Sequence, residues 1–190
     1  MIWVTGDTHG DWIHRVNMDS FPEQREMSKD DYVIILGDFG IWRDSPQQRW
    51  YLNWLEEKHF TTLFIDGNHE NYDILDSYPV EEWHGGKVHF IKPSIIHLMR
   101  GQVFDIDGLK FFTFGGASSH DISDGVLEID DPRVKEWRDD PDKMYRINHI
   151  SWWEREMPNQ EEMDEGIKNL AEHDLSLIHI SEPTRLRRIS

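Results

Sequence analysis

The stretch Tyr32-Val33-Ile34-Ile35-Leu36-Gly37-Asp38 decides the fold, because a run of strand-forming residues leads directly into a Gly-Asp pair. Two other stretches have the same design: Met1 to Val4 precedes Gly6-Asp7-Thr8-His9-Gly10-Asp11, and Thr62 to Ile65 precedes Gly67-Asn68-His69-Glu70. The apolar runs do not alternate with polar residues, as expected of strands that are buried on both faces. The sequence therefore predicts a parallel sheet with a polar loop after each of these strands.

The spacing of the loops supports parallel strands. Asp7 and Asp38 are about thirty residues apart, and so are Asp38 and Asn68, which is enough for a helical crossover between parallel neighbours. Ligands of such sheets bind beyond the carboxyl ends of the strands. We therefore expect the polar side chains of the three loops to gather at one edge of the sheet.

These loops carry residue types that bind metal ions. Carboxylates are hard oxygen donors that can bridge two divalent cations, imidazole favours Mn, Fe or Zn over Mg or Ca, and an Asn amide adds a neutral oxygen. A single Gly-Asp or Gly-Asn pair after a strand is as typical of a turn or a helix cap. Three such blocks in order, each after a strand, favour a metal site.

The three blocks resemble those of the calcineurin-like metallophosphoesterases, which read Asp-x-His, Gly-Asp and Gly-Asn-His-Asp/Glu. The resemblance implies an α/β fold, a calcineurin-like phosphoesterase sandwich of mixed β-sheets flanked by helices. It also implies that Asp7 and His9 hold a first metal ion and that Asp38 bridges two ions. Asn68 would hold the second ion, and His69 would lie near the substrate phosphate as a proton donor.

The function implied by this resemblance is metal-dependent hydrolysis of phosphomonoester or phosphodiester bonds through a metal-bridging hydroxide. Two divalent ions, Mn, Fe or Zn, are the implied cofactors, and a phosphorylated small molecule or another phosphoester is the implied substrate. The alternative is a non-catalytic metal-binding or phosphate-sensing protein on the same fold. The oligomeric state is left open.

The second block departs from the pattern of many relatives, which read Gly-Asp-x-x-Asp-Arg, because Ile41 and Trp42 stand where the Asp and the Arg would be. The Asp that orients the catalytic His and the Arg that grips phosphate therefore have no counterparts. Arg43 and His120 are the remaining candidates for substrate binding. We expect Glu70 to be structural, because an acid in the first turn of a helix is stabilised by the helix dipole.

The family's later motifs, a lone His and Gly-His-x-His, are not found, so we expect the fold to be incomplete at the carboxyl end. Residues 175–185 resemble the translation of a transposon-derived sequencing adapter. We therefore expect residues 1–174 to be the amino-terminal part of a metallophosphoesterase domain and residues 175–190 to be a non-native tail. The rival interpretation is a basic tail that binds a partner. With half of the implied ligands missing, this polypeptide is expected to be inactive.

Composition limits the possible partners. The formal net charge of −17 repels nucleic-acid backbones, so no sequence-independent nucleic-acid binding is expected. The length of 190 residues favours one domain, and the lack of cysteine excludes disulfides, thiolate ligands and a cysteine nucleophile. No stretch approaches the roughly twenty apolar residues of a membrane span, so we expect a cytoplasmic protein without a membrane segment.

Several further elements can be predicted. Helices are expected over 11–18 and from a Ser45–Gln48 capping box to about residue 59. Later segments of strand-forming residues are expected at 88–91, 95–99, 102–106 and 109–114. An Asp107-Gly108 pair between the last two predicts a hairpin.

The carboxyl-terminal third is more polar. Residues 118–146 show no clean period, which is typical of a functional lid or of disorder. A capping box at Ser151 and Glu154 predicts a short helix, and Asn159 with Glu162 predicts another helix. In that helix an apolar face is expected, made of Met163, Ile167 and Leu170.

Overall fold

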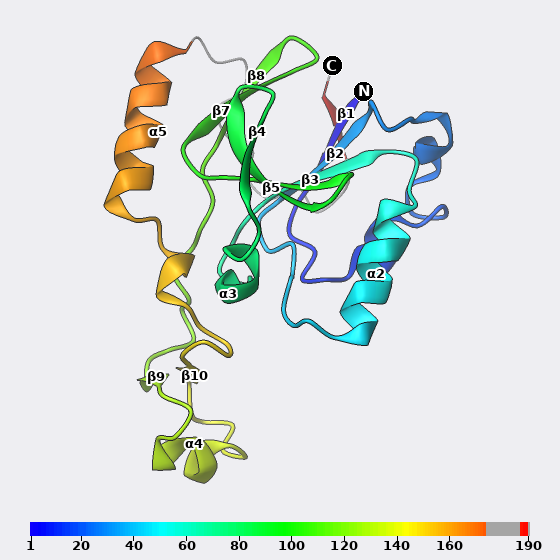
Figure 1. The fold of residues 1–190 in the computed structure, drawn as a ribbon. Coiled ribbons are helices and arrows are strands. Elements are labelled where there is room, and N and C mark those ends of the chain that lie inside the picture. Colours follow the sequence, from blue (N-terminus) through cyan, green and yellow to red (C-terminus); the bar gives the residue numbers. More distant parts are fainter. Residues whose placement is uncertain (174–186, 190) are drawn as a thin grey trace.

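The computed structural model describes residues 1–173 and 187–189, which form a seven-stranded mixed sheet flanked by helices (Figure 1). Its strand order is β11-β1-β2-β3-β6-β5-β4. Four central strands run parallel: β1 Ile2–Thr5, β2 Tyr32–Leu36, β3 Thr61–Ile65 and β6 Ile95–Leu98. Three strands are antiparallel to their neighbours: β5 Gly86–Lys92, β4 Val80–Trp83 and β11 Arg187–Ile189. The predicted parallel arrangement of β1, β2 and β3 is confirmed.

Helices make the crossovers between the parallel strands, as predicted. Helix α1 Trp12–Val16 and the 3-10 helix η1 Pro22–Glu26 connect β1 to β2, and α2 Pro46–Glu56 connects β2 to β3. The Ser45 hydroxyl caps α2 by accepting a hydrogen bond from the Gln48 main-chain nitrogen at 3.1 Å. The Gln48 side chain instead accepts from the nitrogens of Trp42 and Arg43, so it secures the loop after Asp38.

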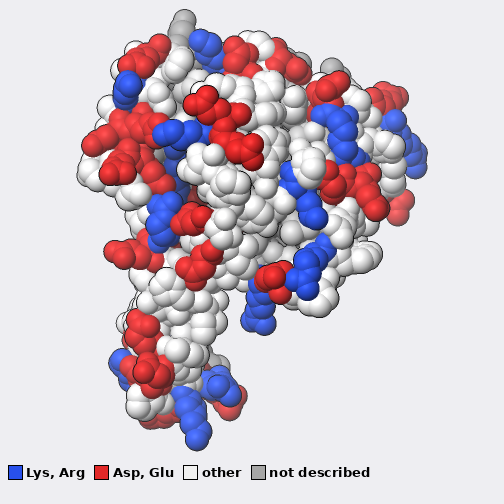
Figure 2. All heavy atoms as spheres, in the orientation of Figure 1, with Lys and Arg blue, Asp and Glu red and all other residues white. Residues whose placement is uncertain are grey.

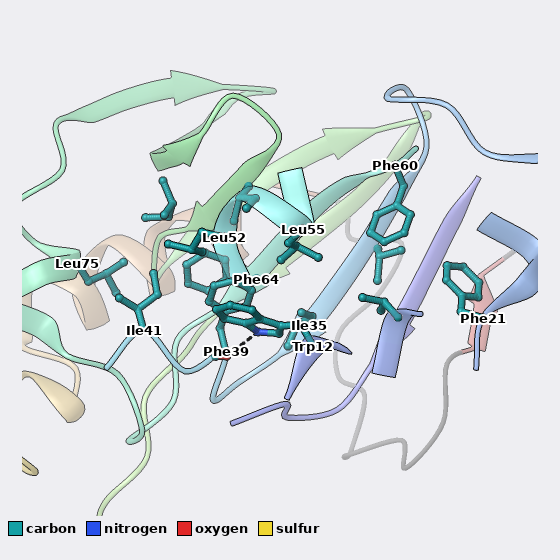
Figure 3. Packing of buried hydrophobic residues seen from close by; sticks show 14 of the residues in the cluster. Trp12, Phe21, Ile35, Phe39, Ile41, Leu52, Leu55, Phe60, Phe64 and Leu75 are labelled. Atoms are coloured by element: carbon teal, nitrogen blue, oxygen red, sulfur yellow. Dashed lines mark hydrogen bonds between the residues drawn. The ribbon is translucent and has the colours of Figure 1, made fainter. Parts of the chain in front are cut away.

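The core lies on both faces of the sheet. Neighbouring residues of β2 show this, because Val33 and Ile35 pack in one cluster while Ile34 packs in the other. In the first cluster, the rings of Trp12, Phe39 and Phe64 stack in a column between the sheet and α2 (Figure 3). This column fixes the loop that begins at Asp38, because the Trp12 indole also donates to the Phe39 carbonyl at 2.9 Å.

A hairpin covers the other face of the sheet. Strands β7 Gln102–Ile106 and β8 Leu109–Thr113 pair antiparallel and contribute Phe104, Ile106 and Phe111 to the second cluster. Their turn has φ of 54° at Asp107 and 77° at Gly108. This left-handed pair is typical of the tight hairpin turn that the sequence predicted.

The region from 118 to 153 forms an extension that projects away from the sheet (Figure 1). Strands β9 Gly125–Leu127 and β10 Tyr145–Ile147 pair within it, and α4 Pro132–Trp137 lies at its far end. The expectation of disorder is therefore wrong, because the segment forms its own small sheet; its role as a lid stays a prediction.

Two short helices and one long helix complete the fold. Helix α3 Tyr72–Leu75 follows the third loop, and the 3-10 helix η2 Glu154–Glu156 follows the extension. The capping box predicted at Ser151 is wrong, since η2 begins after Trp153 and the Ser151 hydroxyl accepts from Ile147. Helix α5 Gln160–Glu172 has the complete predicted capping box. Its face of Met163, Ile167 and Leu170 is exposed.

Charge and hydropathy add two observations. Acidic and basic side chains are interspersed on the face shown in Figure 2. Within residues 1–173 and 187–189, no helix has the length and apolar character needed to cross a membrane. The expected absence of nucleic-acid binding and the cytoplasmic location stay predictions.

Candidate metal centre

The first two ligand loops are joined through their main chains. The nitrogens of Thr8 and His9 both donate to the Asp38 carbonyl, at 3.1 and 2.8 Å. His9 and Asp38 both have a left-handed backbone, with φ of 46° and 44°. Such conformations are rare for residues with a side chain and gather at functional sites, where the surrounding structure holds them.

Two glycines allow the three loops to pack closely. A Cβ atom on Gly40 would lie 2.3 Å from the Gly10 nitrogen, so the first and second loops touch through their backbones. A Cβ atom on Gly67 would lie 1.9 Å from Asp38 Oδ1 and 2.7 Å from the Asp38 nitrogen. Only glycine therefore lets the third loop reach the Asp38 carboxylate.

The predicted ligand side chains converge at this junction. His9 Nε2 lies 2.7 Å from Asp7 Oδ2 and 3.7 Å from Asp38 Oδ2. The His69 nitrogen donates to Asp38 Oδ1 at 3.0 Å. One possible ligand atom from each of His9, Asp38 and His69 lies within 4.8 Å of the other two. In the described part of the chain, these three residues form the group of His, Asp or Glu side chains that is close enough to hold a metal ion.

The donor set fits divalent metal ions. Carboxylate oxygens and imidazole nitrogens lie together, and this mixture suits Mn, Fe or Zn. Asn68 stands between Gly67 and His69, both of which contact the Asp38 carboxylate. Its amide nitrogen donates to Ser119 Oγ at 3.2 Å. His9 and Asp38 could therefore contribute to one ion, and Asp38 and Asn68 to a second. Asp7 is not part of the His9–Asp38–His69 group and contacts it through His9.

The His69 ring packs edge-on against two neighbours, His9 at a centroid distance of 4.6 Å and Trp42 at 5.2 Å. Burial lowers the pKa of His69; the Asp38 carboxylate opposes this effect, whereas His9 and Arg146 add to it. Trp42 thus occupies space beside His69, at the sequence position where many relatives carry an arginine.

Glu70 is structural, as predicted, but for a different physical reason. Its side chain is fully buried and accepts hydrogen bonds from the main-chain nitrogens of Gly40 and Ile41. Burial raises the pKa of Glu70 well above its ordinary value, although these two donors oppose the effect. Glu70 therefore ties the third loop to the second instead of acting through a helix dipole.

A buried ionic network that the sequence did not reveal lies behind the third loop. Asp66 accepts from Arg100 Nε at 2.7 Å and from the Tyr72 hydroxyl at 2.9 Å. His97 Nε2 lies 3.1 Å from the same carboxylate. Burial would raise the pKa of Asp66, but His97 and Arg100 hold it well below its usual value. Because Asp66 directly precedes Gly67, this network fixes the start of the third loop.

The two predicted substrate-binding residues are exposed. In the described part of the chain, no hydrogen bond, ion pair or ring contact joins the side chain of Arg43 or His120 to the ligand cluster. Sequence reasoning missed Arg146, which pairs with Asp121 at 2.8 Å and lies close enough to His69 to lower its pKa. No local motif marks Arg146, because the extension brings it to the site.

The comparison with protein families agrees with this geometry. The model of the calcineurin-like phosphoesterases matches residues 1–179. No curated protein and no solved structure matches the chain at a significant level. The mixed sheet flanked by helices is consistent with the fold of that family, and the family is metal-dependent, acts on phosphoesters and usually holds two divalent ions. The chain therefore belongs to the calcineurin-like phosphoesterase family.

Proposed function

We propose that this protein is a phosphoesterase that uses two divalent metal ions, Mn, Fe or Zn, to hydrolyse phosphomonoester or phosphodiester bonds in a phosphorylated small molecule or another phosphoester. With half of the implied ligands missing, the 190-residue polypeptide itself should have little or no activity. Asp7 and His9 would hold the first ion, Asp38 would be shared, and Asn68 would serve the second. The observation that carries the proposal is the position of the Asp38 carboxylate. Its two oxygens face different loops, one toward the His69 nitrogen and one toward His9.

When bound, the ions would lower the pKa of a coordinated water and neutralise charge that develops on phosphate. The chain's own residues hold the geometry. Asp38 is fixed by the His69 nitrogen and by contact with Gly67, so its carboxylate does not need to reorganise. His9 is oriented by Asp7.

His69 is proposed to give a proton to the leaving oxygen. Burial lowers the pKa of His69; Asp38 opposes this effect, and His9 and Arg146 add to it. A bound phosphate would act in the opposite direction, because a nearby anion favours the protonated imidazole.

A specific observation also supports the non-catalytic alternative. Ile41, which stands where many relatives carry the Asp that orients the catalytic His, is buried in the apolar core. The His69 ring is contacted by Trp42 and not by a second carboxylate of that loop. A protein that binds metal or phosphate without turnover would tolerate this change.

The test compares Asp38→Asn with a matched control. Both Asp38 and Asp107 have a left-handed backbone, and Asn tolerates that conformation well. Asp38→Asn should remove bound Mn together with whatever activity the parent protein has, whereas Asp107→Asn, in the β7–β8 turn, should leave both unchanged. Asp7→Asn should weaken one ion more than the other.

Metal content is measured by elemental analysis, and activity is measured with p-nitrophenyl phosphate and bis-p-nitrophenyl phosphate. Two unchanged Mn equivalents in Asp38→Asn would refute the bridging role of Asp38. Hydrolysis of either substrate by the parent protein would refute the non-catalytic alternative.

A further inference from the structure

A chain of hydrogen bonds leads from Asn68 into the protein interior. Asn68 Nδ2 donates to Ser119 Oγ at 3.2 Å. The Ser119 hydroxyl and main-chain nitrogen both donate to the Glu156 carboxylate, each at 2.7 Å. Ser119 is 4% exposed and Glu156 is 2% exposed, so solvent does not compete with these bonds.

The directions of these bonds fix the orientation of the Asn68 amide. A carboxylate can only accept, and a serine hydroxyl has one proton to give. Because Ser119 gives that proton to Glu156, its oxygen can only accept from Asn68. The amide nitrogen must therefore face Ser119, and Oδ1 must face the other way.

Asn68 Oδ1 is left as an acceptor for a ligand. In residues 1–173 and 187–189, no hydrogen-bond donor contacts this oxygen. Since the main chain on both sides of Asn68 touches the Asp38 carboxylate, the amide lies beside the shared ligand of the proposed centre. An amide oxygen, unlike an amide nitrogen, can bind a cation.

Arg100 holds the main chain at Glu156 in place. Arg100 Nη2 donates to the carbonyls of Arg155 and Glu156, at 2.9 and 3.3 Å. The same guanidinium pairs through Nε with Asp66, next to the third loop. Arg100 thus fixes η2 and the start of the third loop relative to each other, which keeps Glu156 in register with Asn68.

We propose that Ser119 and Glu156 are positioning residues, which orient the Asn68 amide so that Oδ1 faces the second metal ion. This inference rests on the proposed function, since it assumes that Asn68 is a ligand. Supporting hydrogen bonds of this kind typically change metal affinity 10–100-fold when they are removed. The second ion should therefore depend on two residues that lie far from Asn68 in sequence.

Three variants and one control test this proposal in the full chain. Ser119→Ala removes the acceptor for Asn68. In Glu156→Gln, the new side-chain amide can donate to the Ser119 oxygen. The Ser119 hydroxyl proton is then free to bind Asn68 Oδ1, so the Asn68 amide can turn its oxygen toward Ser119. Ser119→Thr keeps the hydroxyl and should restore wild-type binding. Ser118→Ala is the control, because the Ser118 hydroxyl contacts only the neighbouring Ser119 carbonyl, at 3.5 Å, among the described residues.

Calorimetric titration with Zn measures both binding events, and thermal unfolding is measured on the same samples. Ser119→Ala and Glu156→Gln should weaken the second event about 10–100-fold and leave the first unchanged. Equal loss of both events would indicate a merely structural role and overturn the proposal. Wild-type affinity for the second ion in both variants would overturn it as well.

A metal-independent measurement separates this inference from the proposed function. The side-chain amide of Asn68 can be identified by NMR from the signal that Asn68→Asp loses. Its protons should exchange slowly with solvent in the parent protein and fast in Ser119→Ala, with or without Zn. If the parent binds no Zn, the proposed function fails, and unchanged exchange in Ser119→Ala would refute the hydrogen-bond chain itself.

Discussion

His89 should make the stability of this protein depend on pH, and the size of the effect follows from its surroundings. The ring is 3% exposed, and its Nδ1 lies 3.2 Å from His97 Nδ1. His97 Nε2 in turn lies 3.1 Å from the Asp66 carboxylate, so the two buried rings and Asp66 form one hydrogen-bonded series. Burial, with a smaller contribution from His97, lowers the pKa of His89 to about 4.

The direction of the pH effect follows from the linkage between proton binding and folding. The unfolded chain has the ordinary histidine pKa of 6.5, so between pH 6.5 and about 4 it binds a proton at His89 that the folded protein does not bind. The contribution of His89 to the free energy of unfolding is therefore fully present above pH 6.5 and is lost as the pH falls toward 4. Between pH 7 and pH 5 this one group should lower the free energy of unfolding by about 2 kcal/mol.

The assay is urea denaturation at both pH values for the parent and for His89→Gln. Glutamine can still donate to His97 but does not titrate, so the variant should lose about 2 kcal/mol less than the parent over this range. His59→Gln, at an exposed histidine, should keep the pH dependence of the parent. If His89→Gln shows the same loss as the parent, the reasoning about His89 is refuted.

Three further changes test the loops and a cap. Gly67→Ala should lower the free energy of unfolding by about 1–3 kcal/mol and weaken Mn binding, because the new Cβ would collide with the Asp38 main chain; thermal unfolding and metal titration measure this. His69→Asn should keep its metal content and lose more turnover on alkyl than on nitrophenyl esters, whereas equal losses would leave His69 only a positioning role. Asn159→Ala should cost about 1 kcal/mol in chemical denaturation, because its capping box with Glu162 is complete, and an unchanged midpoint would argue that α5 is held by packing alone.

The central sheet could be predicted from sequence because its signals are local. Strands β1, β2 and β3 are buried on both faces, so they appear as uninterrupted apolar runs. Strand β4 was missed for the opposite reason, since Val80, Glu81 and Glu82 are exposed at the edge of the sheet. The extension was missed because it buries few apolar side chains, among them Leu127 and Val134.

The ligands could be proposed from sequence for a similar reason. Asp7 and Asp38 directly follow strands, and the order of parallel strands brings such positions together. Arg146, Ser119 and Glu156 reach the site only through the extension and η2. Their residue types are common on any surface, and no spacing relates them to the ligand blocks, so only the folded chain reveals them.

Differences in burial and hydrogen bonding explain why only some of the acidic side chains near the loops would bind metal ions. Asp66 is paired with Arg100 and hydrogen-bonded to His97, and burial keeps the pKa of Glu70 high. Both side chains already accept hydrogen bonds within the fold. Asp7 and Asp38 differ, because the carboxylate of Asp7 is partly exposed and Asp38 Oδ2 lies 3.7 Å from the His9 ring, at the ligand cluster. The buried carboxylates therefore hold the loops in place, and the accessible ones are left to bind cations.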